Sequence, residues 1–191
     1  MNTNKNPRAA FAKALEEAVA EKPYQKVKVG DIAERCSLGR TSFYRYFRDK
    51  QDLVEWMYSS EYKATVYKRL RIEEEKGYRY WRNMGECIYY TLLEKPQFYR
   101  RIAEYDGQNC FIDFLSVHEA NSVEKYLKWT LDMDSLPEEL VFDISFYYAG
   151  FANAVKRWIA RGMRETPEHM QKQCERNLPP YMREYLMRCG R

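Results

Sequence analysis

The stretch that most constrains this chain is residues 27–53, VKVGDIAERCSLGRTSFYRYFRDKQDL. Within it, residues 39–47 have the pattern of one short helix in which Phe43 and Phe47 lie four residues apart, so both rings share a face that can be buried. A tight connection separates this helix from a second apolar-faced segment at residues 31–36. Two short helices joined by about three residues form a helix-turn-helix, whose second helix fits the major groove of DNA. The side chains with hydrogen-bonding tips on that helix are Arg40, Thr41, Tyr44 and Arg45.

Proline, glycine and capping residues divide the chain into helical segments, and the sequence contains no alternating strand pattern of any length. Asn6 and Pro7 predict the start of the first helix, and residues 135–138 (SLPE) predict a capping box for a late one. We therefore expect an all-α protein of about nine helices. Their expected ranges are 7–22, 31–36, 39–47, 50–76, 78–94, 97–105, 109–131, 137–161 and 166–188, the last interrupted at Pro179-Pro180.

Positive charge is concentrated in the first quarter of the chain. Residues 1–50 contain 11 Lys and Arg against 6 Asp and Glu, whereas the remaining 141 residues contain 21 against 22. This distribution predicts a head that binds a polyanion, carried on a nearly neutral body. A basic surface that is merely solvated is the alternative that charge alone leaves open.

Several classes of protein do not fit the sequence. No apolar run approaches the roughly 20 residues of a membrane helix, and the N-terminus lacks the apolar run of a signal peptide, so we expect a cytoplasmic protein without a membrane partner. Five scattered cysteines form no C-x-x-C pair, which argues against a disulfide framework or a zinc site. The sequence has no P-loop, no G-x-S-x-G, no H-E-x-x-H and no dinucleotide fingerprint. We therefore expect no enzyme activity, no metal and no cofactor.

The opening stretch resembles the DNA-binding head of TetR-type transcriptional regulators. The resemblance implies a helix-turn-helix head at residues 1–53 and a helical body for effector binding and dimerisation at residues 54–191. Within the body, FYYAGFANAVKRWIARGMRETPEHM resembles a sub-branch that includes regulators linked to dihydroxyacetone kinase genes. The positions shared with the family's head are Val29, Asp31-Ile32-Ala33, Leu38, Ser42-Phe43-Tyr44, Tyr46-Phe47, Lys50 and Leu53, with Phe11 in a preceding helix.

The resemblance and the side-chain chemistry together assign the DNA contacts. Arg40 is the expected base reader because its fork matches guanine O6 and N7, with a phosphate contact as the alternative. Thr41 and Ser42 are expected at a thymine methyl or a phosphate. Lys50, at the start of the fourth helix, is expected at a phosphate, as is Lys28, which replaces a capping threonine common in the family. The other expected contacts are Tyr44, Arg45, Tyr46 and, from the N-terminal arm, Lys5 and Arg8.

Two further positions depart from the family pattern. Ser37 occupies a turn position that often holds glycine, and Gly30 occupies a position from which some members read a base. Because glycine has no side chain to reach DNA, base reading is expected to fall on the helix at residues 39–47.

The family places an effector pocket among the middle helices, where this chain is rich in aromatic residues. His118 is the most informative candidate, because a lone histidine on a largely apolar helix either fills the core or orients a polar ligand. Simple core packing is the alternative for the whole set. The candidates are Tyr62, Trp81, Met84, Ile88, Phe98, Phe111, Phe114, His118 and Tyr147.

The predicted helix at residues 137–161 is apolar most of the way round, so it needs cover on several sides. Helix-turn-helix heads usually act in pairs, and we therefore expect a homodimer that contacts its partner through this helix. A central core helix without a dimer role is the alternative. The stripe assigned to the contact consists of Ile144, Tyr148, Phe151, Val155 and Trp158.

These expectations describe a transcriptional repressor that binds a pseudo-palindromic operator in double-stranded DNA as a dimer and is released by a small-molecule effector. The alternative is a co-regulator or activator that keeps the same fold and acts mainly through protein partners.

Overall fold

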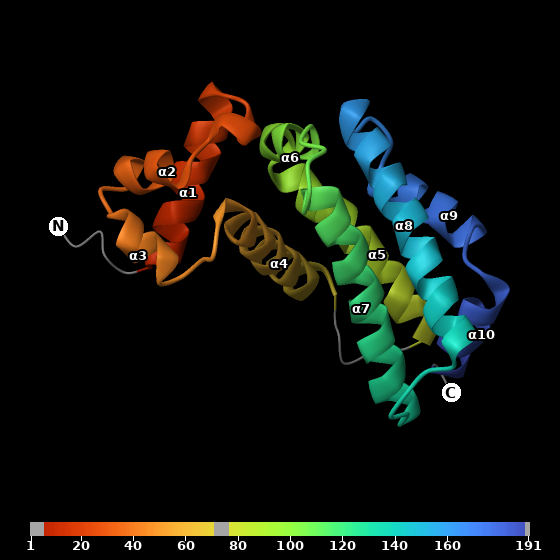
Figure 1. Ribbon diagram of the computed structural model, residues 1–191. Helices are drawn as coiled ribbons and strands as arrows, with labels where there is room; N and C mark the ends of the chain where they lie inside the picture. Colours follow the sequence, from red (N-terminus) through yellow and green to blue (C-terminus); the bar gives the residue numbers. More distant parts are fainter. Residues whose placement is uncertain (1–5, 71–76, 190–191) are drawn as a thin grey trace.

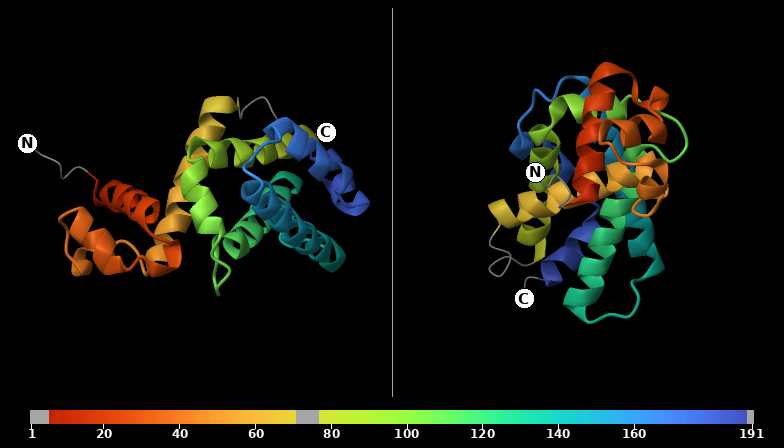
Figure 2. Two further views of the ribbon diagram at one scale, coloured as in Figure 1. Left: turned by 90° about the horizontal axis from the view of Figure 1, so that it is seen from above. Right: turned by 90° about the vertical axis from the view of Figure 1, so that its left-hand side faces the viewer.

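The computed structural model describes residues 6–70 and 77–189, which contain α-helices and one short 3-10 helix but no strand. The predicted all-α class is confirmed. Helices α1 to α3 form a head at one end, α4 leads away from it, and α5 to α10 form the body (Figure 1; two further views in Figure 2). In chain order the elements are α1 (Pro7–Glu21), η1 (Tyr24–Lys26), α2 (Val29–Arg35), α3 (Arg40–Tyr44), α4 (Lys50–Arg69), α5 (Gly77–Glu94), α6 (Pro96–Ala103), α7 (Phe111–Leu131), α8 (Glu138–Ala160), α9 (Pro167–Arg176) and α10 (Pro180–Arg188).

Two helix ends differ from the prediction. α4 ends at Arg69 because Leu70 adopts extended backbone angles (φ −113°, ψ 138°). Residues 71–76, over which the helix was expected to continue, lie outside the described residues. Gly77, expected to stop that helix, is instead the first residue of α5.

Proline explains two other differences. The expected capping box at residues 135–138 is wrong, since Pro137 itself is the N-cap of α8 and makes no side-chain hydrogen bond. Pro179 and Pro180 separate α9 from α10, so the described residues form ten α-helices where about nine were expected.

Aromatic rings build the core of the head. Phe11 of α1 meets Phe43 of α3 edge to face, with ring centroids 5.1 Å apart, and Phe43 lies 5.6 Å from Phe47. Trp56 of α4 continues the cluster, 5.7 Å from Phe47. Burying each phenylalanine contributes roughly 1.5–3 kcal/mol, so these rings hold α3 and α4 against α1.

A polar cluster fastens the head to the body. The ammonium of Lys95, at the start of α6, lies 2.6 Å from Glu61 of α4 and 2.5 Å from Glu16 of α1. The Tyr99 hydroxyl donates a hydrogen bond to the second carboxylate oxygen of Glu61. The cluster therefore joins the head, α4 and the body at one point.

The body is built around α7 and α8, which pack side by side, while α5 lies against α4 and α9 (Figure 1). No helix within the described ranges has the length and apolarity needed to cross a membrane.

Candidate functional site

The tip of the head is α3, and its two faces differ as predicted. Phe43 is fully buried, while Arg40, Thr41 and Tyr44 are exposed. The helix ends at Tyr44, earlier than expected, and the exposed residues Arg45 and Tyr46 follow in a turn. Ser42 is half-buried. Cationic, hydroxyl and phenol groups therefore project together from one exposed surface, which is the side-chain chemistry that phosphates and base edges require.

Arg40 lies over the first turn of α2. A Cβ atom built on Gly30 would come within 2.5 Å of Arg40 Nη2 and 2.9 Å of Arg40 Nε. A side chain at position 30 would therefore push the guanidinium aside, which a flexible arginine allows. Sequence reasoning treated Gly30 only as a missing base reader, whereas the structure shows that it also makes room for Arg40.

The turn between α2 and α3 contains a left-handed residue. Ser37 has φ 54°, and the Leu38 N–H donates to the Ala33 carbonyl at 2.9 Å, closing the end of α2. A left-handed backbone suits glycine better than serine. This preference explains why TetR-type heads often have glycine at the turn position that Ser37 occupies here.

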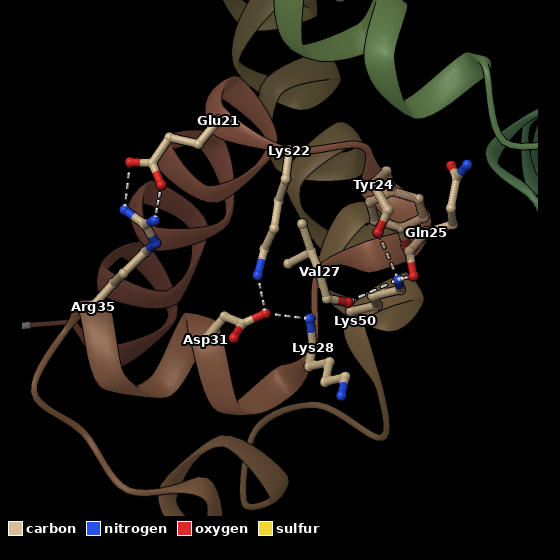
Figure 3. A network of polar contacts seen from close by, with 9 residues as sticks. All are labelled: Glu21, Lys22, Tyr24, Gln25, Val27, Lys28, Asp31, Arg35 and Lys50. Atoms are coloured by element: carbon tan, nitrogen blue, oxygen red, sulfur yellow. Dashed lines mark hydrogen bonds and ion pairs between the residues drawn. The ribbon is translucent and has the colours of Figure 1, made fainter.

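A network of polar contacts fixes the start of α2 (Figure 3). One carboxylate oxygen of Asp31 accepts a hydrogen bond from the Lys28 backbone N–H at 2.8 Å and lies 2.6 Å from Lys22 Nζ. The Lys22 contact, followed by the Lys28 N–H, lowers the pKa of Asp31. The Lys28 ammonium points away from this network and is exposed. It is thus placed where a phosphate could meet it.

Lys50 corrects the prediction of a phosphate contact at the start of α4. Its ammonium donates to the carbonyl oxygens of Tyr24 at 2.7 Å, Val27 at 2.9 Å and Gln25 at 3.4 Å (Figure 3). An ammonium has three donors, and here each is directed at the backbone around η1. Partial burial lowers the pKa of Lys50. Lys50 therefore ties η1 to α4 inside the head and has no donor left for DNA.

The N-terminal arm is described only from Asn6 onward. The Arg8 guanidinium lies over the rings of Phe47 and Tyr46, with its carbon 5.7 Å and 6.0 Å from the two ring centroids. Its charge therefore interacts with aromatic rings of the head. Lys5, expected beside it as a backbone contact, lies outside the described residues.

The nine predicted pocket residues do not share one site. Tyr62, Trp81, Met84 and Ile88 line a cavity of about 110 Å³ between α4, α5 and α7. The remainder lie elsewhere: Phe114 and His118 beside a hollow of about 480 Å³ facing the start of α4, Phe98 beside a hollow of about 250 Å³ near α1, and Phe111 and Tyr147 within the core.

Sequence reasoning missed Glu119, the carboxylate that lines the cavity between α4, α5 and α7. A signal was present, because Glu119 lies midway between Leu115 and Val123 at a spacing of four residues. It therefore occupies a buried position of an otherwise apolar stripe on α7. His118, beside it, has its pKa lowered by burial and then by Lys125.

The stripe of α8 expected at a dimer contact faces the protomer's own core. Ile144 and Val155 are fully buried, Phe151 and Trp158 pack on Tyr89 of α5, and the hydroxyl of Tyr148 accepts a hydrogen bond from Trp81. The assignment of these five residues to the dimer contact is therefore wrong.

The opposite side of α8 is both apolar and exposed. Phe142 is 65% exposed and Phe146 is 72% exposed, and their rings stack with centroids 6.0 Å apart. Two small exposed residues, Ala149 and Gly150, continue this face by about one helical turn beyond Phe146.

Comparisons with known proteins place both parts of the chain. Residues 12–57 match the family described as bacterial regulatory proteins, tetR family, and residues 79–179 match a transcriptional regulator C-terminal region. A curated relative, the HTH-type dhaKLM operon transcriptional activator DhaS of Lactococcus lactis subsp. lactis (strain IL1403), is 24% identical over 117 residues. The match covers 61% of this chain and 58% of that protein's length.

Two solved structures share the fold. The dihydroxyacetone kinase operon activator DhaS superposes with a TM-score of 0.57 at 21% identity, covering 90% of this chain and 93% of that one. The TetR family repressor AlkX from Dietzia sp. strain DQ12-45-1b, implicated in biodegradation of n-alkanes, gives 0.52 at 16% identity, covering 97% and 100%.

Proposed function

Because the chain belongs to the TetR family of bacterial transcriptional regulators, we propose that it regulates transcription as a dimer that binds a pseudo-palindromic operator through α3. The observation that supports this best is the exposed surface of Arg40, Thr41 and Tyr44 on a helix held by the buried Phe43. Arg40 reads a guanine, and Lys28, Arg45 and Tyr46 hold flanking phosphates. The head is residues 1–53 and the body residues 54–191.

The dimer forms through the exposed face of α8. Phe142 and Phe146 are large apolar side chains in contact with each other and with solvent, and burying them against a partner removes an apolar patch from water. Ala149 and Gly150 allow two helices to approach closely. A pair of heads then binds half-sites about one helical turn of DNA apart.

An effector acts by favouring one spacing of the two heads. α4 connects the head to the body, and Lys50 ties its first turn to η1. A ligand in the body can change DNA binding only to the extent that it prefers one position of α4 over another.

The test is selection of genomic fragments by the full chain, followed by footprinting of the bound fragments. We expect protection of two related half-sites about 34–36 Å apart, with affinity that falls as salt increases. Protection of a single half-site would contradict the dimeric operator.

For the direction of regulation, we propose repression, and activation through protein partners is the second candidate. The second candidate is supported by the curated relative, which is named as an activator. A reporter fused to the selected promoter separates them: its expression rises on deletion of the regulator if the protein represses, and falls if it activates.

A further inference from the structure

The cavity between α4, α5 and α7 combines aromatic walls with one buried carboxylate. Tyr80 and Tyr126 stack at 4.6 Å on one side. Trp81 and Tyr148, joined by a hydrogen bond of 3.1 Å from the indole N–H, lie on another. The full lining is Tyr62, Tyr80, Trp81, Met84, Gly85, Ile88, Glu119, Ser122, Val123, Tyr126 and Tyr148.

Glu119 is 4% exposed and lines this cavity. Tyr58 of α4 donates a hydrogen bond of 2.9 Å to one oxygen. No lysine, arginine or histidine lines the cavity within the described parts of the chain. The nearby phenols have other partners as well: Tyr62 donates to the Met84 carbonyl, and Tyr126 accepts from the Gly77 N–H.

A buried carboxylate without a cation is costly, and the protein can lower that cost only by protonating it or by pairing it. Burial raises the pKa of Glu119 to about 7, so near neutral pH neither protonation state strongly dominates. A cation that enters the cavity would supply the missing partner. The tyrosine and tryptophan faces around it would attract the same charge, since aromatic faces are electronegative.

We propose that this cavity binds a small organic cation, an ammonium ion whose charge pairs with Glu119 and whose alkyl groups lie against the surrounding rings. The proposal rests on the proposed function, because it names the class of effector of this regulator. The volume of about 110 Å³ limits the ligand to a few heavy atoms, since a cavity of about 150 Å³ holds benzene. The Tyr58 hydrogen bond connects the site to α4, the helix that leads to the head.

The experiment is calorimetric titration of the full chain with methylammonium, ethylammonium, n-propylammonium and n-butylammonium, and with the four uncharged primary alcohols of the same chain lengths. We expect at least one ammonium ion to bind, about tenfold or more tightly than the alcohol of the same chain length. This contrast needs no variant. Equal binding of that ammonium ion and its matching alcohol would overturn the proposal, and so would failure of all four ammonium ions to bind at about 10 mM, the limit of weak binding.

Two variants locate the site. Glu119→Gln keeps an oxygen that accepts from Tyr58 but removes the charge, so we expect it to weaken binding of the ammonium ion about tenfold or more. Glu124→Gln removes a carboxylate of the same helix outside the lining and should leave binding unchanged. Unchanged ammonium binding by Glu119→Gln would overturn the assignment.

The titration contains no DNA, so it is independent of operator binding. Failure of the parent protein to bind any DNA would contradict the proposed function and leave the calorimetric result intact. If the parent protein binds DNA but binds none of the ammonium ions, only the proposed ligand class is contradicted.

Discussion

The hydroxyl of Tyr58 on α4 donates a 2.9 Å hydrogen bond to the carboxylate of Glu119 on α7. This contact is buried and joins residues 61 positions apart in sequence. It places an ionisable group of the body directly against the helix that leads to the head.

The first prediction concerns the pH dependence of stability. Burial raises the pKa of Glu119 from 4.5 to about 7, so between these values the folded state keeps a proton that the unfolded state has lost. The free energy of unfolding therefore falls as pH rises through this range, by on the order of 3 kcal/mol in total. Above about pH 7 the full penalty is present.

Glu119→Gln removes that penalty. We expect the variant to exceed the parent in free energy of unfolding by on the order of 3 kcal/mol at about pH 8, and by much less at about pH 5. Urea unfolding of both proteins at the same protein concentration measures the difference in free energy of unfolding. The contributions of all other titrating groups cancel in this difference. A difference that does not change between the two pH values would contradict the raised pKa.

The second prediction separates two lysines of the head. Lys50→Met removes three hydrogen bonds to carbonyls, so we expect the free energy of unfolding to fall by about 1–3 kcal/mol. Lys28→Met removes an exposed charge, so it should change stability by less than about 0.5 kcal/mol and lower the salt dependence of DNA binding by about one phosphate contact.

Thermal unfolding and salt titration of DNA binding measure the two effects. If Lys50→Met were as stable as the parent and instead lost one phosphate contact, the assignment of Lys50 to the head's internal structure would be wrong.

The third prediction concerns the dimer. Replacing both Phe142 and Phe146 by serine removes the exposed apolar face of α8 while leaving the buried stripe intact, so the double variant should sediment as a monomer at concentrations where the parent is a dimer. Val117→Ser on α7, which removes a 60% exposed side chain elsewhere, is the control and should not change the mass. A dimeric double variant would show that the partner contact lies elsewhere.

The head could be predicted from the sequence because its pattern is local. The spacing of Phe43 and Phe47 identified the buried face of α3, and the exposed positions of Arg40, Thr41 and Tyr44 followed from it. Lys50 could not be placed in this way. Its carbonyl partners lie 23 to 26 residues earlier in the chain, and only the tertiary fold brings them to its ammonium.

The body shows the same limit more strongly. α8 is apolar on nearly all sides, so periodicity alone did not tell its inner face from its outer one, and the buried stripe that includes Trp158 was assigned to a partner. Only the packing of Tyr89 against Phe151 and Trp158 separates the two faces. The sequence predicted only part of the cavity lining for a similar reason. The lining residues come from α4, α5, α7 and α8, and only the tertiary fold brings these helices together.

The central claim, that α3 reads DNA, is tested most directly by the affinity of Arg40→Ala for a selected operator duplex and for a scrambled duplex, measured by fluorescence anisotropy over about 50–200 mM salt. The parent should bind both duplexes in a salt-dependent way and prefer the operator. Arg40→Ala should lose about 1–3 kcal/mol on the operator and little of its binding to the scrambled duplex. The claim would be contradicted if Arg40→Ala bound each of the two duplexes as tightly as the parent does, or if the parent showed no salt-sensitive DNA binding at any sequence.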